Sequence, residues 1–318
     1  MEIYTRIAIQ LGDAIIHNDL PLVSASLEGD YTASIEEKLS FVVPRLVDDF
    51  DYAPYDALAP LACEGQRAVL SIEQDGVVYD RGVYLLTDVA VTGTEVSVTA
   101  MSLTRLLDEA DFSVPYQPAA GRTYKGALYD VAGGALDLVF DTNTPADVAV
   151  PAVVYEGTRL DSVYALGDAW GATIETGQDG ELIIGRVPPT PVTVELTESP
   201  QWQTSRDRLW NVVIARGEDV NGNPVHSTAP ITSGSRVLDG LSTPLPVYYT
   251  YENANLTTVQ KCTIAAIAIA ARIKRRTGPQ LQTSIVPQVG MRLGDPVITQ
   301  GSTWTVQSFT LPLLPAGP

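Results

Sequence analysis

The side chains that could bind a metal ion gather in one short acidic segment. The run Asp48-Asp49-Phe50-Asp51 is followed by Asp56, and calcium prefers several carboxylates on a flexible loop. The segment lacks the spaced acidic positions and the final bidentate glutamate of a known calcium loop. We therefore interpret residues 48–56 as a solvated acidic loop and leave cation binding open. The glycine-rich segment 177–180 could be mistaken for a metal loop, but its Asp-Gly pair is typical of a hairpin turn.

Nucleophilic catalysis needs a base beside a nucleophile, and the chain has few candidates. Its two histidines, His17 and His226, stand at no familiar spacing from Ser, Cys or Asp. We expect His226 to be a solvated loop residue, and we expect Cys63 and Cys262 to be buried free thiols. The sequence contains no G-x-S-x-G, no H-E-x-x-H and no phosphate-binding G-x-x-x-x-G-K. The sequence therefore predicts a non-enzymatic protein with no catalytic, cofactor-binding or metal-binding residues.

Four tryptophans could stack on sugars. Trp170 ends an amphipathic segment, and Trp210 and Trp304 fall inside strand patterns, so we predict core positions for these three. Trp202 lies in a polar segment and is the best candidate for an exposed aromatic. Together with the aromatic cluster 248–251, it would serve an alternative function, that of a glycan-binding adhesion module.

The first third of the chain has the alternating pattern of β-strands. Turn signals such as Gln74-Asp75-Gly76 separate the runs, and Ser102 is positioned to cap a short helix over 103–109. Short strands at this spacing are typical of a barrel or a sandwich. The predicted strands are Tyr4–Leu11, Leu22–Tyr31, Lys38–Val43, Ala68–Gln74, Val77–Ala90 and Thr94–Ala100.

The middle of the chain mixes helices and strands. Residues 112–118 form an extended, proline-bearing connector, and 123–136 has helical spacing interrupted by glycines. A better helix is predicted over 158–170, ended by Gly171. A hairpin follows over 173–185, and the proline-rich segment 188–191 is a candidate domain boundary.

The last third carries the clearest helix, over 257–277. Thr257 and Gln260 form a capping-box pair. Ile264, Ile267, Ala268 and Ala271 form an apolar stripe, which we expect to face the core. The basic residues 274–276 follow in the last turn, where the helix dipole favours cations. Strands 282–286, 296–299 and 303–309 are too short to stand alone, so we expect them to pair with 192–196 and 210–215 in a second barrel.

These patterns predict a mainly β chain with an α+β insert. The 318 residues allow two or three domains. We predict an N-terminal β-barrel over 1–110, an α+β insert over 111–190, and a second β-barrel over 191–318 that includes the helix 257–277.

The charge balance limits the partners. The formal net charge is −18, from 38 acidic and 20 basic side chains, whereas a nucleic-acid grip needs clustered Lys and Arg. The N-terminus shows no signal-peptide pattern, and the most apolar run, 262–271, is too short to span a bilayer. We expect a protein that is made in a cytoplasm and does not itself insert in a membrane.

Four parts of the sequence, in this order, carry a resemblance to a known family. They are 58–69 leading to 80–89, then 165–172 leading to Arg186-Val187-Pro188, then 209–218, and finally the helix from Thr257 with 293–297 and 304–313. The chain resembles the hub or minor tail proteins at the tail tip of siphophages that infect actinobacteria. These are similar in fold to the central hub of contractile-tail baseplates. The acidic loop at 48–55 is longer than the family pattern.

The resemblance implies a structural role in the virion, at the tail tip. It implies a homotrimer whose six barrels form a pseudo-sixfold ring that meets a hexameric tail ring. The implied partners are the distal tail ring protein, the tape measure protein and other tail-tip proteins. DNA would pass through a central channel without specific binding. We expect no appended lysozyme or peptidase, and a cell-wall hydrolase is the weakest competing interpretation.

Overall fold

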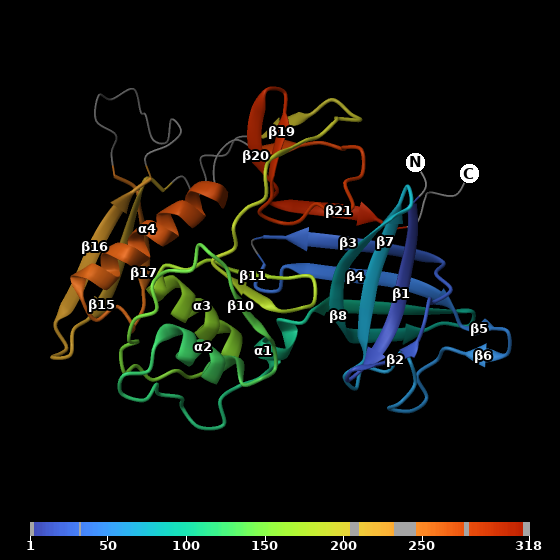
Figure 1. Ribbon diagram of the computed structural model, residues 1–318, viewed down its shortest axis with the longest axis horizontal. Helices are drawn as coiled ribbons and strands as arrows, with labels where there is room; N and C mark the ends of the chain where they lie inside the picture. Colours follow the sequence, from blue (N-terminus) through green and yellow to red (C-terminus); the bar gives the residue numbers. More distant parts are fainter. Residues whose placement is uncertain (1–2, 32, 204–209, 232–245, 277–279, 314–318) are drawn as a thin grey trace.

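An eight-stranded antiparallel sheet forms the N-terminal part of the molecule (Figure 1). The computed structural model describes residues 3–31, 33–203, 210–231, 246–276 and 280–313, without the side chains of 272 and 274–276. The strands follow the order β2-β1-β7-β8-β9-β4-β3-β21. Their bounds are Ile3–Leu11 (β1), Ala14–His17 (β2), Ser24–Asp30 (β3), Glu37–Pro44 (β4), Arg67–Gln74 (β7), Val77–Val91 (β8), Glu95–Ser102 (β9) and Ser308–Pro312 (β21).

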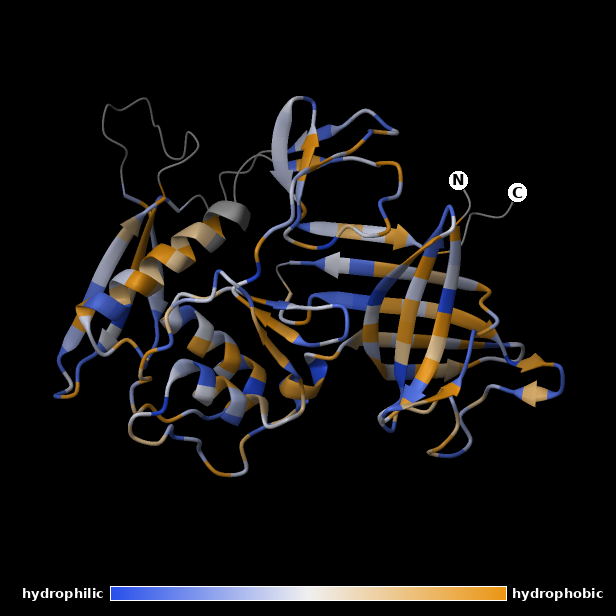
Figure 2. Ribbon diagram, viewed as in Figure 1, coloured by the Kyte–Doolittle hydropathy of each residue, from blue (hydrophilic) through white to orange (hydrophobic). Residues whose placement is uncertain are grey.

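Alternation along the strands produces the core of this sheet. In β1, Ile7 and Ile9 are fully buried, and in β7, Leu70 and Ile72 are buried too, because residues two apart share a face. Figure 2 shows the same alternation as orange and paler bands along the strands. The sheet curves until its ends approach, and Thr5 of β1 donates a hydrogen bond to the carbonyl of Leu313, just after β21. A small hairpin, β5 (Leu46–Val47) and β6 (Phe50–Asp51), projects from one end.

The insert combines helices with a small mixed sheet of order β10-β12-β11. Its main helix begins where the Thr158 hydroxyl accepts a hydrogen bond from the amide of Asp161, 3.1 Å away. It ends at Gly171, whose φ of 82° is the left-handed conformation that glycine adopts without strain. The bounds are Arg105–Glu109 (α1), Tyr124–Ala132 (α2), Arg159–Trp170 (α3), Leu138–Phe140 (β10), Ile174–Thr176 (β11) and Leu182–Ile184 (β12).

The last part of the chain forms three small sheets and one long helix. The sheets have the orders β13-β19-β20, β14-β18 and β16-β15-β17. Helix α4 packs on the third sheet. The bounds are Val192–Thr193 (β13), Gln201–Gln203 (β14), Val212–Glu218 (β15), Pro224–Pro230 (β16), Tyr248–Glu252 (β17), Val259–Arg276 (α4), Gln280–Gln282 (β18), Pro296–Thr299 (β19) and Ser302–Thr305 (β20).

Two large hydrophobic cores and a small third one, formed by Tyr31, Leu293 and Val306, lie within the described part of the chain. One large core lies inside the curved sheet. The other large core is shared by α2 and α3 of the insert with α4 and β15, so that Leu166 of the insert and Ile269 of α4 belong to the same cluster. The insert is therefore packed directly on the α4 sheet. The domain boundaries at 110 and 190 stay a prediction.

Helix α4 has the opposite orientation from the one we expected. Its buried side chains are Cys262, Ala265, Ala266, Ile269, Ala270 and Ile273. Ile264 and Ile267 of the predicted stripe are 40% and 59% exposed. The expectation failed because α4 is apolar on two faces, and the face that carries Ala265, Ala266 and Ile269 is the one that packs into the core. Cap geometry differs too, since the Thr258 hydroxyl, not that of Thr257, accepts from the amide of Lys261.

The mainly β fold with an α+β insert is confirmed. The expected strand pairing near the C-terminus is right for 192–196, which also bridges Ile285 from Leu196, and wrong for 210–215 and for the last strand. β13 does pair with β19. However, β15 pairs with β16 and β17, and β21 joins β3 of the first sheet. Ser102 is also not a helix cap, because it ends β9 and its hydroxyl contacts that of Thr104. No helix in the described part of the chain has the length and apolarity needed to cross a membrane.

Candidate functional site

Two aspartates of the acidic segment 48–56 make hydrogen bonds to neighbouring groups of the chain. Asp51 lies 3.2 Å from the Arg45 guanidinium, and that hydrogen bond lowers the pKa of the Asp51 carboxyl. Asp56 accepts a hydrogen bond from the amide of Leu58, 2.8 Å away. No group of three His, Cys, Asp or Glu side chains among the described residues is placed to hold a metal ion. The interpretation of this segment as a solvated acidic loop stays a prediction.

The histidines and cysteines form no catalytic pair among the contacts of the described residues. His17 contacts the Tyr52 hydroxyl at 3.1 Å, and burial lowers the pKa of His17. His226 is exposed as expected but lies on β16 rather than in a loop. Cys262 is buried, whereas Cys63 is exposed, contrary to the expectation of two buried thiols. Cys63 lies in the loop before β7, outside the alternating pattern that buries the strand residues.

The aromatic side chains follow the sequence prediction in part. Trp170 is buried and stacks on Tyr124, with ring centroids 5.5 Å apart. Trp202 is 58% exposed and packs edge-on against the half-buried Trp304. Tyr248 is also exposed. Trp202 and Tyr248 lie on separate sheets, β14 and β17, so the fold does not gather them into one sheet surface.

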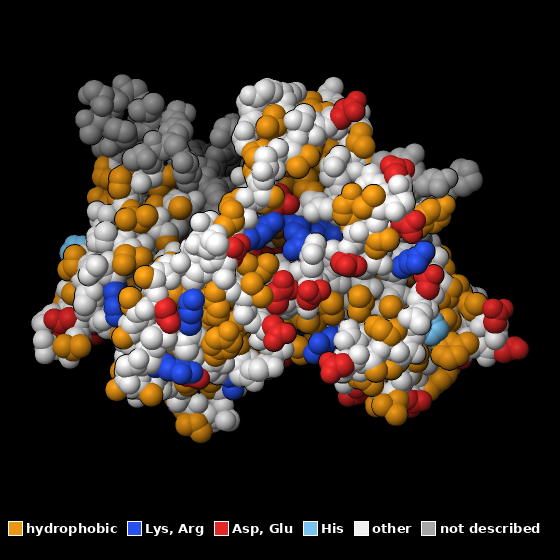
Figure 3. All heavy atoms as spheres, in the orientation of Figure 1, with side chains coloured by type: hydrophobic (Ala, Val, Ile, Leu, Met, Phe, Trp, Pro, Cys, Tyr) orange, Lys and Arg blue, Asp and Glu red, His pale blue; other side chains and the backbone are white. Residues whose placement is uncertain are grey.

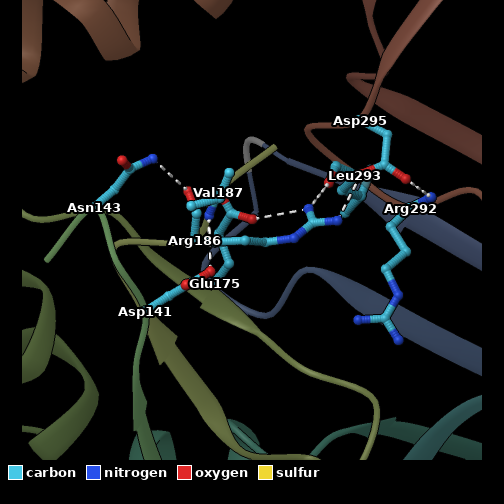
Figure 4. A network of polar contacts seen from close by, with 8 residues as sticks. All are labelled: Asp141, Asn143, Glu175, Arg186, Val187, Arg292, Leu293 and Asp295. Carbon is cyan, nitrogen blue, oxygen red and sulfur yellow. Dashed lines mark hydrogen bonds and ion pairs between the residues drawn. The ribbon is translucent and has the colours of Figure 1, made fainter. Parts of the chain in front are cut away.

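A largely buried arginine, Arg186, whose side chain is 16% exposed, joins the insert to the C-terminal segment (Figure 4). It follows β12, and its Nη1 donates to the carboxylate of Glu175 on β11, 3.1 Å away. Its Nη2 donates to Asp295 at 2.6 Å, and Nη1 also lies 3.3 Å from the Leu293 carbonyl. These contacts cross from one end of the insert to the loop before β19. We call this set of residues the arginine junction.

The backbone on both sides of Arg186 is fixed by neighbouring groups. Asp141 accepts a hydrogen bond from the amide of Val187, 3.0 Å away. At Gly185, φ is 71°, and an added Cβ would overlap the backbone of Thr144. Only glycine therefore fits where β12 passes this loop. On the other side, Asp295 accepts from the amide of Arg292 at 2.8 Å, so the carboxylate is oriented toward Arg186.

Two further arginines lie near the junction. Burial disfavours the Arg186 cation, but the hydrogen bond to Asp295 and the charge of Glu175 outweigh this, so its pKa is raised. Burial and the neighbouring Arg81 and Arg186 charges lower the pKa of Arg292. Arg81, on β8, lies 3.8 Å from Glu37 and stacks on the Phe309 ring. Lys and Arg side chains are visible in a hollow at the middle of the molecule in Figure 3.

The arginine junction holds parts of the fold together and shows no arrangement for a reaction. Sequence reasoning did not predict it, because an arginine and an aspartate more than a hundred residues apart give no periodic signal. Arg186 and Asp295 do lie within two of the segments that carry the family resemblance. The basic residues 274–276, expected at the end of α4, lie outside the described side chains.

Three solved structures share this fold over nearly the whole chain. A tail protein from Neisseria meningitidis has a TM-score of 0.60 and 12% identity, and the match covers 96% of this chain and 91% of that one. A 43 kDa tail protein of prophage MuSo2 from Shewanella oneidensis has a TM-score of 0.64 and 12% identity, with 97% and 94% covered. The prophage tail protein gp18 from Listeria monocytogenes has a TM-score of 0.57 and 11% identity, with 97% and 90% covered.

The sequence itself matches no family model and no curated protein. The similarity is therefore one of fold. At that level the resemblance to phage tail proteins is confirmed, and it extends across all parts of the chain.

Proposed function

We propose that this chain is a non-enzymatic structural subunit of a phage tail, located at the tail tip. The observation that carries the proposal is the match in fold to three tail proteins, two of them from prophages, over at least 96% of the chain. A match of this extent supports a structural role for the chain as a whole. The absence of a catalytic motif from the sequence agrees with this assignment.

In the proposed assembly, three copies form a closed ring that surrounds the DNA exit channel. The ring joins the tail tube, through the distal tail ring protein and the tape measure protein, to the more distal tip proteins. Closed cyclic assemblies are the usual result when identical chains repeat one contact. The protein would be made in the host bacterial cytoplasm and carried in the virion.

Electron microscopy tests this proposal. Antibody-gold labelling of virions should mark the tip of the tail, and class averages of the purified protein should show threefold rings. Labelling of the capsid or of the tail shaft alone would contradict the tail-tip position. Virions without any label would contradict the structural role itself.

In the same proposal, part of the net charge of −18 lines the DNA channel. Acidic side chains that line the channel would repel the DNA phosphates and so prevent DNA from sticking during ejection. Replacing channel-facing acids by lysine should slow ejection in a salt-dependent manner. Unchanged ejection kinetics would argue against an acidic lining.

A glycan-binding function is the second candidate, because Trp202 is 58% exposed. A glycan array probed with the purified protein tests it. Binding that is lost in Trp202→Ala would favour an adhesion module. An array without signal would leave the structural role as the sole candidate.

A further inference from the structure

Two arginines beside the arginine junction share a single carboxylate. Arg81 extends from β8, and Arg292 lies in the segment before β19. Glu37, at the start of β4, lies 3.8 Å from Arg81 Nη2 and accepts a hydrogen bond from the Tyr84 hydroxyl, 2.8 Å away. Burial lowers the pKa of Arg292, the charges of Arg81 and Arg186 lower it further, and Glu37 opposes them. We call Arg81, Arg292, Glu37 and Tyr84 the two-arginine site.

Several guanidinium nitrogens of this site lack a hydrogen-bond partner. The Arg81 side chain is 2% exposed, and its Nε and Nη2 atoms are buried without an acceptor in the described part of the chain. Nη2 of Arg292 is buried in the same way. In Figure 4 the Arg292 guanidinium points away from Asp295, and no dashed line reaches it. Burying a donor without an acceptor costs free energy, and more so for a charged group, so the site is short of acceptors.

The neighbouring Arg186 shows what the two-arginine site lacks. Its guanidinium donates to both Glu175 and Asp295, so these two carboxylates are already paired. The described ion pairs place only Glu37 beside Arg81. Arg81 and Arg292 together therefore carry one positive charge more than the carboxylate between them balances.

The site is reached from solvent at Arg292. This residue is partly exposed, and Figure 3 shows Lys and Arg side chains gathered in a hollow at the middle of the molecule. Arg81 lies deeper, with its guanidinium carbon 5.3 Å from the centre of the Phe309 ring. Because no hydrogen bond to a described residue holds the Arg292 guanidinium, a rotation of this side chain gives a small ligand access to the unpaired nitrogens.

We propose that the two-arginine site binds inorganic phosphate as its singly protonated ion. Three phosphate oxygens accept hydrogen bonds from Arg292 and Arg81, whose planar guanidinium groups suit oxyanions. The remaining P–O–H group donates to Glu37 Oε1, which at 3.8 Å is too far from Arg81 Nη2 for a hydrogen bond. Water also accepts N–H bonds, but it brings no charge to balance two largely buried cations. The binding is a property of the single chain and does not depend on the proposed function.

Glu37 determines which anion fits. Sulfate carries no proton at neutral pH, so it would place a negative oxygen against the Glu37 carboxylate, and like charges at this distance repel. A phosphomonoester loses its last proton at about pH 6, so at pH 7.5 it has the same defect. Inorganic phosphate keeps one proton at this pH. The site therefore selects inorganic phosphate over both.

Isothermal titration calorimetry of the full-length protein tests the proposal at pH 7.5 and constant ionic strength. Phosphate should bind at one site per chain, and sulfate and methyl phosphate should bind at least about tenfold more weakly, which corresponds to the loss of one hydrogen bond. Arg292→Met should abolish the binding. Arg216→Met removes the same charge from an arginine on β15 whose side chain is 52% exposed, and it should bind phosphate as the parent does.

A second variant tests the role of Glu37. In Glu37→Gln, the amide nitrogen donates to an anion while the amide oxygen still accepts from Tyr84, so sulfate should bind at least as tightly as phosphate. Equal affinity of the parent for phosphate and sulfate would overturn the selection by Glu37. An absence of phosphate binding, or unchanged binding in Arg292→Met, would overturn the site itself.

Native-state hydrogen exchange on the parent protein requires no substitution. Phosphate should slow exchange of the Arg292 amide at least about tenfold relative to sulfate at the same ionic strength, because the ligand ties its segment to β4 and β8. Amides of α3, which has no contact with the site, should exchange equally in the two salts. Equal slowing in both salts at all amides would contradict the proposal, because it would indicate the general stabilisation that both anions give.

Discussion

Removing the guanidinium of Arg186 should weaken the connection between the insert and the C-terminal segment. The Arg186 side chain is 16% exposed, and its partners Glu175 and Asp295 are each 11% exposed. In Arg186→Met, both carboxylates lose their cation in a nearly buried position. Breaking a buried ion pair from one side costs about 3–5 kcal/mol. We expect about 3 kcal/mol here, because Asp295 keeps its hydrogen bond from the Arg292 amide.

Two variants show whether geometry or charge is responsible. Arg186→Lys keeps the charge but cannot donate to both carboxylates in the fork geometry, so it should lose about half as much free energy of unfolding. Arg6→Met removes an ion pair with Glu73 in which the arginine is 61% exposed, and it should lose much less.

Equilibrium urea unfolding, followed by tryptophan fluorescence and circular dichroism, measures these differences. Native-state hydrogen exchange adds a local probe at the Arg292 amide, which Asp295 holds. The exchange of that amide should accelerate in Arg186→Met before global unfolding does. If Arg186→Met lowers the free energy of unfolding by less than about 1 kcal/mol, or if the Met and Lys variants lower it equally, the bonds of the guanidinium to both carboxylates have no stabilising role.

Three further outcomes follow from the fold. Thr158→Ala should cost about 1 kcal/mol through the lost helix cap, and Thr158→Ser should retain it, as measured by the shift in urea midpoint. Ile269→Ala should lower the free energy of unfolding by about 3 kcal/mol, because Ile269 is fully buried. Ile267→Ala should lower it by less than about 0.5 kcal/mol, because Ile267 is exposed. The reverse order would contradict the orientation of α4. Burial raises the pKa of Tyr124 to about 12, above the usual value of about 10 in an unfolded chain, so its contribution to stability is complete below pH ~10 and is lost as the pH rises toward 12. Alkaline unfolding curves of the parent and of Tyr124→Phe measure this contribution, and superimposable curves would argue against it.

The strands and helices with a local signal could be predicted from the sequence. The alternation in 4–11 and 68–74 matches β1 and β7, and the cap at Thr158 and stop at Gly171 match α3 closely. These elements were predictable because the burial period and the capping residues agree within a few positions.

Long-range pairing was not predictable in the same way. Strand 308–312 carries the same alternation whether it joins a second barrel or β3, and nothing local distinguishes the two. The prediction of which face of α4 is buried failed for a related reason, because a helix rich in Ala and Ile has two apolar faces. The contacts of Arg186 depend on tertiary structure alone. The one signal in the sequence was that Arg186 lies in a segment that carries the family resemblance.

The pairing of β21 with β3 has a consequence for synthesis of the chain. Ser308 lies opposite Asp30, so the edge of the first sheet is completed only after almost all of the sequence has left the ribosome. Until then, β3 presents an unpaired edge, which is a template for aggregation. A nascent or prematurely terminated chain is therefore at risk, and folding of this sheet is tied to translation of the last strand. Ribosome stalling before residue 308 should leave nascent chains that bind chaperones, and release after it should free them.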